Sequence, residues 1–223
     1  MSILTMQEVS YTYQSRYQKV QALNHVTCTF EPGNFYAIVG HSGSGKTTLL
    51  SMLAGLDSPT EGEVMIDGKP LSEFGEERHC RENVSVIYQS FNLFPALTIL
   101  ENVMYPMRIV RKSAAQAKVR AKELLSDVGL SDVSPKKRPA MLSGGQQQRV
   151  AIARALASES KIILADEPTG NLDSESGRLI VDLLRRLVDE RGYCVIVVTH
   201  DMDIASQADK VYRLKDGVLD QDW

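Results

Sequence analysis

Cysteine is scarce in this sequence of 223 residues, and the placement of the few cysteines excludes two kinds of stabilised fold. Cys28, Cys80 and Cys194 are odd in number, lie far apart and form no C-x-x-C pair. A disulfide framework needs paired cysteines, and a structural zinc site needs closely spaced ligands. We therefore expect three free thiols, as is usual in a reducing cytosol.

A basic excess and long apolar runs are also missing. The formal net charge is −3, whereas a dedicated nucleic-acid-binding domain usually carries a strong positive charge. The run Val195–Val198 suits a buried strand but is far too short to span a bilayer. Met1–Ser10 lacks the basic start and apolar core of a signal peptide. We expect a cytosolic chain with no nucleic-acid partner, which another polypeptide would have to bring to a membrane.

The first part of the chain has the composition and patterning of a globular α/β protein. Hydrophobic residues make up 43% of the sequence, enough to bury a sizeable core in one domain. Alternating and compact apolar runs bounded by turn residues indicate strands. We predict strands over Ile3–Tyr13, Val20–Phe30, Phe35–Val39, Glu63–Gly68 and Val84–Gln89, and a helix over Thr47–Ala54 that Gly55 ends.

The pattern changes twice in the second part. From Phe91 to Met141 we find no strong strand pattern, and helices are predicted over Ile99–Val110 and Ser113–Val128. From Ser143 onward, helices and strands alternate, which predicts a parallel sheet with right-handed crossovers. The helices are expected over Gly145–Ala157, Ser174–Arg191 and Met202–Gln207, and the strands over Lys161–Ala165 and Val195–Thr199. The stretch between the two α/β parts is therefore interpreted as a helical insert.

A glycine-rich loop follows the strand Phe35–Val39 and carries the strongest chemical signal. Residues 40–47, the phosphate loop, match G-x-x-x-x-G-K-[ST] in full, with a strand before and a helix after. Glycines let such a loop aim successive N–H groups at phosphate oxygens, and the helix N-terminus adds its positive end. The candidate nucleotide-binding residues are Gly40, His41, Ser42, Gly43, Ser44, Gly45, Lys46, Thr47 and the following Thr48. Lys46 would reach the β- and γ-phosphates, and the Thr47 hydroxyl would coordinate Mg²⁺.

Two adjacent carboxylates end a later apolar strand. Asp166, at the strand's carboxyl end, is a candidate Mg²⁺ ligand. Neighbouring side chains of an extended chain face opposite sides, so Glu167 would point elsewhere and could act as the general base on the attacking water.

A second helix start with an anion-binding character lies far from the first in sequence. Ser143 stands where a helix N-cap belongs, and Gly144 and Gly145 leave the backbone amides unobstructed. An ordinary capped helix start explains the serine but not the paired glycines.

In these features the chain resembles the ATP-binding subunits of ABC transporters over essentially its whole length. Residues 40–47 resemble the family's Walker A loop, Asp166 and Glu167 the end of its Walker B strand, and Leu142–Gln146 its signature motif. The resemblance implies four further roles, which we list with their residues. They are a glutamine sensing Mg²⁺ and the attacking water (Gln89), a D-loop (Asn171–Asp173), a switch histidine on the γ-phosphate (His200) and an adenine-stacking aromatic (Tyr13, with Tyr11 as a competitor).

The resemblance also implies a fold and a domain division. We expect a P-loop NTPase core with a parallel sheet, an N-terminal antiparallel β subdomain and an inserted α-helical subdomain, together one ABC ATPase domain over residues 1–223. The core and β subdomain would comprise residues 1–89 and 143–223, and the helical subdomain about 90–142. The end of the chain at Trp223 leaves no room for a regulatory domain.

The implied function is that of an ATPase that drives a separate membrane protein. ATP and Mg²⁺ would be bound between two copies of the chain arranged head to tail, each ATP lying between one phosphate loop and the partner's Ser143, Gly144, Gly145 and Gln146. The dimer would act on an integral-membrane permease from the cytoplasmic face of the cell membrane. A groove near Phe91–Tyr105 would take the permease's coupling helix, with Phe91, Leu93, Phe94 and Leu97 as candidate contacts.

Alternatives in other classes are a DNA-repair or chromosome-organising ATPase and a translation factor of the same superfamily. The sequence has no heptad run, no C-x-x-C pair and no second phosphate loop, which disfavours both. Within the transporters, the stretches Tyr88–Pro95, Gln146–Arg149 and Asp166–Asp173 resemble the ATPases of lipoprotein-releasing, macrolide-exporting, peptide-antibiotic-detoxifying and cell-division complexes. A set of cations on the predicted helices is interpreted chiefly as a solvated face, with contact to lipid headgroups or the permease as the alternative: Arg108, Arg111, Lys112, Lys118, Arg120 and Lys122.

Overall fold

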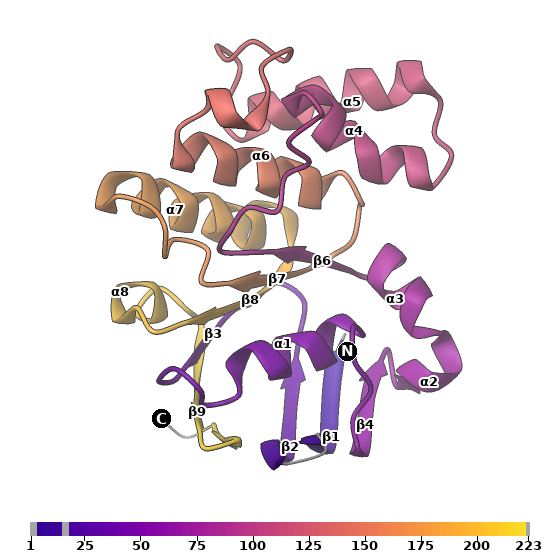
Figure 1. The fold of residues 1–223 in the computed structure, drawn as a ribbon, viewed down its shortest axis with the longest axis vertical. Coiled ribbons are helices and arrows are strands. Elements are labelled where there is room, and N and C mark those ends of the chain that lie inside the picture. Colours follow the sequence, from indigo (N-terminus) through magenta and orange to yellow (C-terminus); the bar gives the residue numbers. More distant parts are fainter. Residues whose placement is uncertain (1–3, 15–17, 222–223) are drawn as a thin grey trace.

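A computed structural model describes residues 4–14 and 18–221, and these form two β-sheets with helices between and around them (Figure 1). Ile3, where the first strand was predicted to begin, and Trp223 lie outside the described residues. The three cysteines are free thiols, as predicted. Within the described ranges no helix is both long and apolar enough to cross a membrane.

The larger sheet has the order β10-β9-β3-β8-β7-β6. Its strands are β3 (Phe35–Val39), β6 (Val84–Ile87), β7 (Ile162–Asp166), β8 (Cys194–Thr199), β9 (Lys210–Lys215) and β10 (Val218–Asp220). All neighbouring pairs are parallel except β9 and β10, which pair antiparallel. Every residue of β3 and β8 is buried, because both faces of a central parallel strand are covered. The parallel sheet predicted from the alternating pattern is confirmed.

Helices cover the two faces of this sheet differently. On one face lie α6 (Gly144–Leu156) and α7 (Ser174–Arg191), and on the other lie α1 (Lys46–Ala54) and the smaller sheet (Figure 1). Successive residues of one strand alternate between the two cores, since Val195 and Val197 pack with α6 and α7 whereas Ile196 and Val198 pack with α1. The helix α8 (Met202–Ala205) follows β8 and is shorter than predicted.

The smaller sheet is antiparallel, with the order β2-β1-β4-β5. Its strands are β1 (Leu4–Gln14), β2 (Lys19–Phe30), β4 (Glu61–Ile66) and β5 (Lys69–Pro70). The pairs β1–β2 and β1–β4 both contain register shifts, and Glu8 and His25 adopt positive φ near those irregularities. β1 and β2 both contact α1.

The stretch between β6 and α6 is helical, as its sequence predicted. It holds α4 (Ile99–Ile109), α5 (Ala114–Asp127) and a 3₁₀ turn over Pro139–Met141. Thr98 with Glu101, and Ser113 with Gln116, form reciprocal capping boxes that start α4 and α5. Two short helices, α2 (Leu71–Phe74) and α3 (Glu76–Glu82), were not predicted from the sequence.

Candidate functional site

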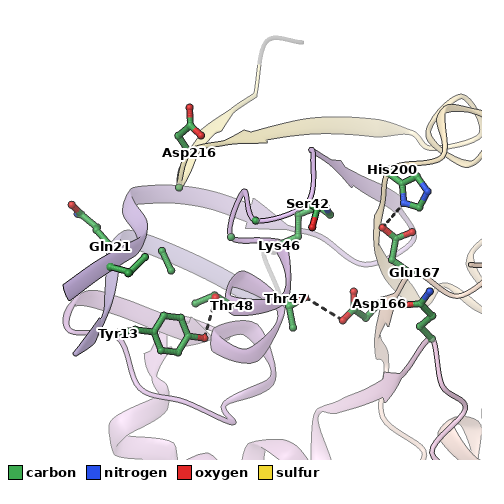
Figure 2. Close-up of a pocket in the computed structure, with 16 residues that line it drawn as sticks. Tyr13, Gln21, Ser42, Lys46, Thr47, Thr48, Asp166, Glu167, His200 and Asp216 are labelled. Atoms are coloured by element: carbon green, nitrogen blue, oxygen red, sulfur yellow. Dashed lines mark hydrogen bonds and ion pairs between the residues drawn. The ribbon is translucent and has the colours of Figure 1, made fainter. Parts of the chain in front are cut away.

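A cavity of about 960 Å³ opens where β3, β7 and β8 end, beside the start of α1. This is the edge of a parallel α/β sheet at which ligands bind. Figure 2 shows it between Tyr13 on one side and Asp166, Glu167 and His200 on the other. The described residues that line it are Tyr13, Val20, Gln21, Ala22, Ser42, Gly43, Gly45, Lys46, Thr47, Thr48, Gln89, Asp166, Glu167, His200, Asp216 and Gly217.

The phosphate loop depends on glycine at Gly43 and Gly45, whose φ angles are +80° and +105°. A Cβ on Gly45 would also lie 2.4 Å from the carbonyl oxygen of Ala22, so β2 and the loop can approach only at glycine. Gly45 is the N-cap of α1 and offers no side-chain acceptor. The first N–H groups of α1 are therefore left to whatever the cavity binds.

Lys46 lies inside the curve of the phosphate loop. Its Nζ donates to the carbonyl oxygens of Gly40 at 2.7 Å and His41 at 3.0 Å, which holds the ammonium against the loop backbone. Of the described residues that line the cavity, Lys46 is the one lysine or arginine, whereas three carboxylates line it: Asp166, Glu167 and Asp216. A polyphosphate entering this cavity would thus need a cation in addition to Lys46.

The remaining loop residues lie around the cavity rather than in its wall. Gly40 and His41 belong to a neighbouring depression with His200. The Ser44 hydroxyl is buried and has no hydrogen-bond partner in the described structure. The backbone carbonyl of Ser44 accepts a hydrogen bond of 3.1 Å from the Gly217 N–H, which connects the phosphate loop to the turn between β9 and β10.

Three side chains with oxygen atoms that could bind a divalent cation line this cavity: those of Thr47, Asp166 and Gln89. The Thr47 Oγ1 donates to Asp166 Oδ2 across 3.4 Å (Figure 2). Hydroxyl, carboxylate and amide oxygens suit Mg²⁺, which typically takes one or two carboxylates and completes its shell with water and phosphate. In the described chain, no group of three or more His, Cys, Asp or Glu side chains could hold a metal ion alone. The donor set thus fits an ion that arrives with the nucleotide.

The pKa of Asp166 is raised, first because the carboxyl is partly buried and then because Glu167 is close by, although Thr47 and Lys46 oppose the shift. A bound cation would lower the pKa of Asp166 again, because a nearby positive charge favours the ionised carboxylate.

Glu167 points away from Asp166, as predicted, but the predicted reason is wrong. The strand ends at Asp166, and Glu167 adopts a left-handed backbone with φ of 44°. This turn directs its carboxylate to the end of β8. There Oε1 lies 2.8 Å from Nδ1 of His200 (Figure 2). Oε2 accepts a hydrogen bond of 3.2 Å from the Thr199 hydroxyl. A non-glycine residue is uncommon in this conformation and costs free energy, which the surrounding contacts must offset.

Gln89 reaches the cavity from a loop, not from a strand end. β6 stops at Ile87, two residues earlier than the predicted strand. The Gln89 carbonyl accepts a hydrogen bond of 3.0 Å from the Asn171 side chain. A Cβ on Gly170 would lie 2.7 Å from Gln89 Nε2, so the segment after Glu167 packs directly against the glutamine side chain.

Tyr13 forms the opposite wall, and Tyr11 does not line the cavity. The Tyr13 hydroxyl and Thr48 Oγ1 are 3.1 Å apart, a hydrogen bond that joins the end of β1 to α1. Tyr11 meets Tyr13 edge to face and packs toward the core instead. Tyr13 is 48% exposed and lines the cavity, as an aromatic residue that stacks on a ligand would need to.

Sequence reasoning missed five lining residues: Val20, Gln21, Ala22, Asp216 and Gly217. The first three start β2, and the last two form the turn between β9 and β10. The Asn24 N–H donates to the Gly217 carbonyl at 2.9 Å, so the two segments hold each other beside the phosphate loop. No local motif marks them; their place depends on how the small sheet packs.

Ser143 and Gln146 form a reciprocal capping box at the start of α6, which confirms Ser143 as the N-cap. None of Ser143, Gly144, Gly145 and Gln146 lines the cavity of the same chain. Ser143 is exposed, but Gly145 is buried, and a Cβ there would lie 2.8 Å from Ser176 Oγ. Gly145 therefore permits the close approach of α7, a reason for glycine that the sequence did not reveal.

A second groove, of about 330 Å³, lies between α3, β6 and α4. Its apolar wall includes Leu56, Val86, Tyr105 and Ile109. Of the four residues proposed for this surface from the sequence, Phe94 lines it, whereas Phe91, Leu93 and Leu97 do not. Leu93 is partly buried and packs against the hydrophobic core instead.

Comparison with known proteins gives concordant results. The family described as ABC transporter matches residues 23–170. The chain is 42% identical to the lipoprotein-releasing system ATP-binding protein LolD of Shewanella denitrificans, covering 98% of this chain and 95% of that protein. It is 42% identical to the macrolide export ATP-binding/permease protein MacB of Mannheimia succiniciproducens, covering 100% of this chain and 35% of that protein. Among solved structures it is similar to the ATP-binding cassette MJ0796, in a dimeric post-hydrolysis state bound to ADP and Pi, with a TM-score of 0.89, 40% identity and 98% coverage of both chains.

Proposed function

The chain belongs to the ABC transporter family and is an ATP-binding, ATP-hydrolysing motor subunit, and from this premise we propose how its residues divide the work. The relatives support a transporter motor rather than a DNA-repair or translation ATPase. The observation that carries the proposal is the meeting of the phosphate loop, Asp166 and Glu167 in one cavity.

Lys46 and the first N–H groups of α1 would bind the phosphates, with Gly40–Thr48 as the cradle. Tyr13 would stack on the base. Thr47, Asp166 and Gln89 would hold Mg²⁺, which supplies charge neutralisation of the phosphates. Their oxygen donors and the excess of carboxylates in the cavity support this choice.

Glu167 would act as the general base on the attacking water. Its carboxylate is held by Thr199 and His200, and this fixed orientation is what general-base catalysis requires. His200 is largely exposed and contacts Glu167 through Nδ1, so its Nε2 is free to face the γ-phosphate.

The complete site would form between two copies of the chain in a head-to-tail dimer. Ser143 is exposed at the start of α6 and does not reach the cavity of its own chain. In the proposed dimer the α6 starts would close the partner's cavities over ATP, and hydrolysis would release them. The similar cassette MJ0796 is itself described as dimeric.

The groove beside Phe94 and Tyr105 would receive a segment of an integral-membrane permease at the cytoplasmic face of the membrane. Phe94, Tyr105 and Ile109 are 38%, 43% and 50% exposed, so the groove presents three large apolar side chains to solvent. An apolar wall suits a protein segment and not a nucleic acid. On this proposal residues 90–142 form a helical subdomain that carries the groove, and residues 1–89 and 143–223 form the core and β subdomain.

Replacement of Glu167 by glutamine tests the proposal. Glu167→Gln should bind ATP normally, hydrolyse it at least about tenfold more slowly and accumulate as an ATP-bound dimer. ATP turnover and sedimentation velocity in Mg-ATP and in Mg-ADP would measure both effects. Glu190→Gln, on the exposed end of α7, is the matched control and should behave like the unmodified chain. Near-normal turnover by Glu167→Gln would remove Glu167 as the base, and a monomer in Mg-ATP would remove the dimer.

A further inference from the structure

The connection from β6 to α4 contains two successive residues in the left-handed region. Phe91 has φ of 63° and Asn92 has φ of 47°. Non-glycine residues rarely adopt this conformation, and phenylalanine has no side-chain acceptor that would favour it. Surrounding contacts must therefore stabilise the turn.

Arg154, near the end of α6, supplies those contacts. Its Nη2 donates to the Phe91 carbonyl at 3.1 Å, and its Nη1 donates to the Asn92 carbonyl at 2.5 Å. Figure 1 shows the connection between β6 and α4 running past α6. The planar guanidinium holds two donors in a fixed fork, so the two carbonyls are fixed relative to each other.

These carbonyls are the principal polar partners of a partly buried cation. No carboxylate of the described chain forms an ion pair with Arg154, and burial lowers the pKa of its guanidinium. The guanidinium also lies over the Phe94 ring, 5.8 Å from its centroid. Removing a cation from water is unfavourable when no carboxylate pairs with it. The partly buried Arg154 guanidinium therefore depends on the two carbonyl contacts that replace its water.

The same short loop carries Gln89 into the ATP cavity. The Phe91 N–H donates to the Tyr88 carbonyl at 3.2 Å, and the Asn92 N–H donates to the Ser90 carbonyl at 2.7 Å. These turns join residues 88–92 into one unit. A shift of the carbonyls held by Arg154 would therefore also shift Gln89.

We propose that Arg154 is a positioning residue for ATP hydrolysis, which fixes the left-handed turn at Phe91–Asn92 and thereby holds Gln89 in the cavity. Arg154 touches neither the phosphate loop nor Asp166 and Glu167, and it acts through the loop. The proposal rests on the role proposed for Gln89. It assigns α6 a function at its last turns in addition to the one proposed for its start.

The test compares Arg154→Gln with Arg149→Gln. Arg149 lies on the same helix and also donates to a backbone carbonyl, that of Gly129 at 3.0 Å, but it has no contact with the loop. Arg154→Gln should lower kcat about tenfold while the Kd for ATP changes less than about twofold. Hydrogen exchange of the amides of residues 88–92 should become about tenfold faster. Arg149→Gln should leave all three quantities unchanged.

Two further variants separate positioning from general damage. Arg154→Lys keeps the positive charge but lacks the planar fork of donors. Its kcat should therefore lie between those of Arg154→Gln and the unmodified chain. Phe91→Gly removes the side chain that makes the left-handed conformation costly at that position, so adding it to Arg154→Gln should recover part of the lost turnover and of the exchange protection.

The outcomes distinguish this inference from the function on which it rests. Unchanged exchange of residues 88–92 in Arg154→Gln and Arg154→Lys would overturn it, as would loss of kcat with no faster exchange. If Gln89→Ala alone keeps full turnover, the role proposed for Gln89 fails. The exchange measurement would then still decide whether Arg154 holds the loop.

Discussion

α1 and α6 both begin at a glycine-rich segment, yet their first turns are satisfied in opposite ways. At α1 the N-cap is Gly45, which offers no side-chain acceptor, and the adjoining phosphate loop adopts left-handed angles at Gly43 and Gly45. At α6 the Ser143 hydroxyl accepts from the Gln146 N–H at 3.3 Å, and the Gln146 side chain accepts from the Ser143 N–H at 3.2 Å. The first helix start needs a ligand to satisfy its donors, whereas the second satisfies part of its own.

This difference explains why one start lies in a cavity and the other on the surface. An uncapped start is stable only if a ligand or solvent binds its N–H groups, and the α1 start faces a cavity suited to an anion and its counterion. A capped start can stay exposed in the free chain and contact a ligand later. The single chain thus contains a nearly complete nucleotide site and, separately, the part that it would contribute to a second copy.

The largest expected effect comes from removing the positive charge of Lys46 at the start of α1. Lys46→Ala should weaken ATP binding about 30- to 150-fold, the size expected for losing a charged hydrogen bond of about 2–3 kcal/mol. The reason is that three carboxylates and no other lysine or arginine line the described cavity. Isothermal titration calorimetry with Mg-ATP measures the change.

Lys69→Ala, on an exposed residue of β5, is the control for Lys46→Ala and should bind as the unmodified chain does. Equal affinity in Lys46→Ala and Lys69→Ala would mean that the phosphate loop is not the binding site.

The second prediction concerns the capped start of α6. Ser143→Ala removes one half of the capping box and should lower the free energy of unfolding by about 1 kcal/mol. For a domain of this length that corresponds to a decrease of about 2–4 °C in Tm. ATP binding to the single chain should not change, because Ser143 does not line the cavity, but ATP-driven dimerisation should weaken.

Ser113→Ala provides a matched control for Ser143→Ala. Ser113 caps α5 through the same reciprocal box, with Gln116, at a helix start to which we assign no ligand. It should lose similar stability and dimerise normally. If Ser113→Ala impaired dimerisation as much, the effect would reflect stability and not a contact with ATP.

The same contrast shows what the sequence could predict. The phosphate loop, Asp166, Glu167 and Ser143 stand in local patterns whose chemistry follows from residue type and spacing. The long helices and all strands except β5, β9 and β10 were predicted because burial imposes a period on apolar residues. By contrast, α2 and α3 are short and largely polar, so no periodic signal marks them.

Tertiary packing decides what local patterns could not. Asp216 and Gly217 line the cavity because a C-terminal turn binds the phosphate loop through Ser44, a contact that joins residues far apart in sequence. Gly145 is required by Ser176 on the next helix and not by an anion alone. The turn at Glu167 was hidden for the same reason, since its carboxylate bonds to Thr199, the last residue of β8, and to His200, which follows that strand.

The smallest effect that we predict has the opposite sign to that of Ser143→Ala. Asp166→Asn should raise the Tm of the nucleotide-free chain at pH 7, on the order of 1–2 °C, because it removes a partly buried charge beside Glu167. The pKa of Asp166 is raised in the fold, so the stability associated with its protonated form is fully present below its ordinary pKa of 3.8 and is lost as the pH rises through the higher folded value. The gain from asparagine should therefore be present at pH 7, shrink as the pH falls through the raised folded pKa, and be gone below the ordinary pKa of 3.8. Thermal melts in the presence of a chelator would measure it, with Asp182→Asn on the exposed face of α7 as control. A lower Tm for Asp166→Asn at pH 7 would mean that Asp166 is already stabilised without a cation, and the contrast between a ligand-dependent α1 side and a self-sufficient α6 start would fail.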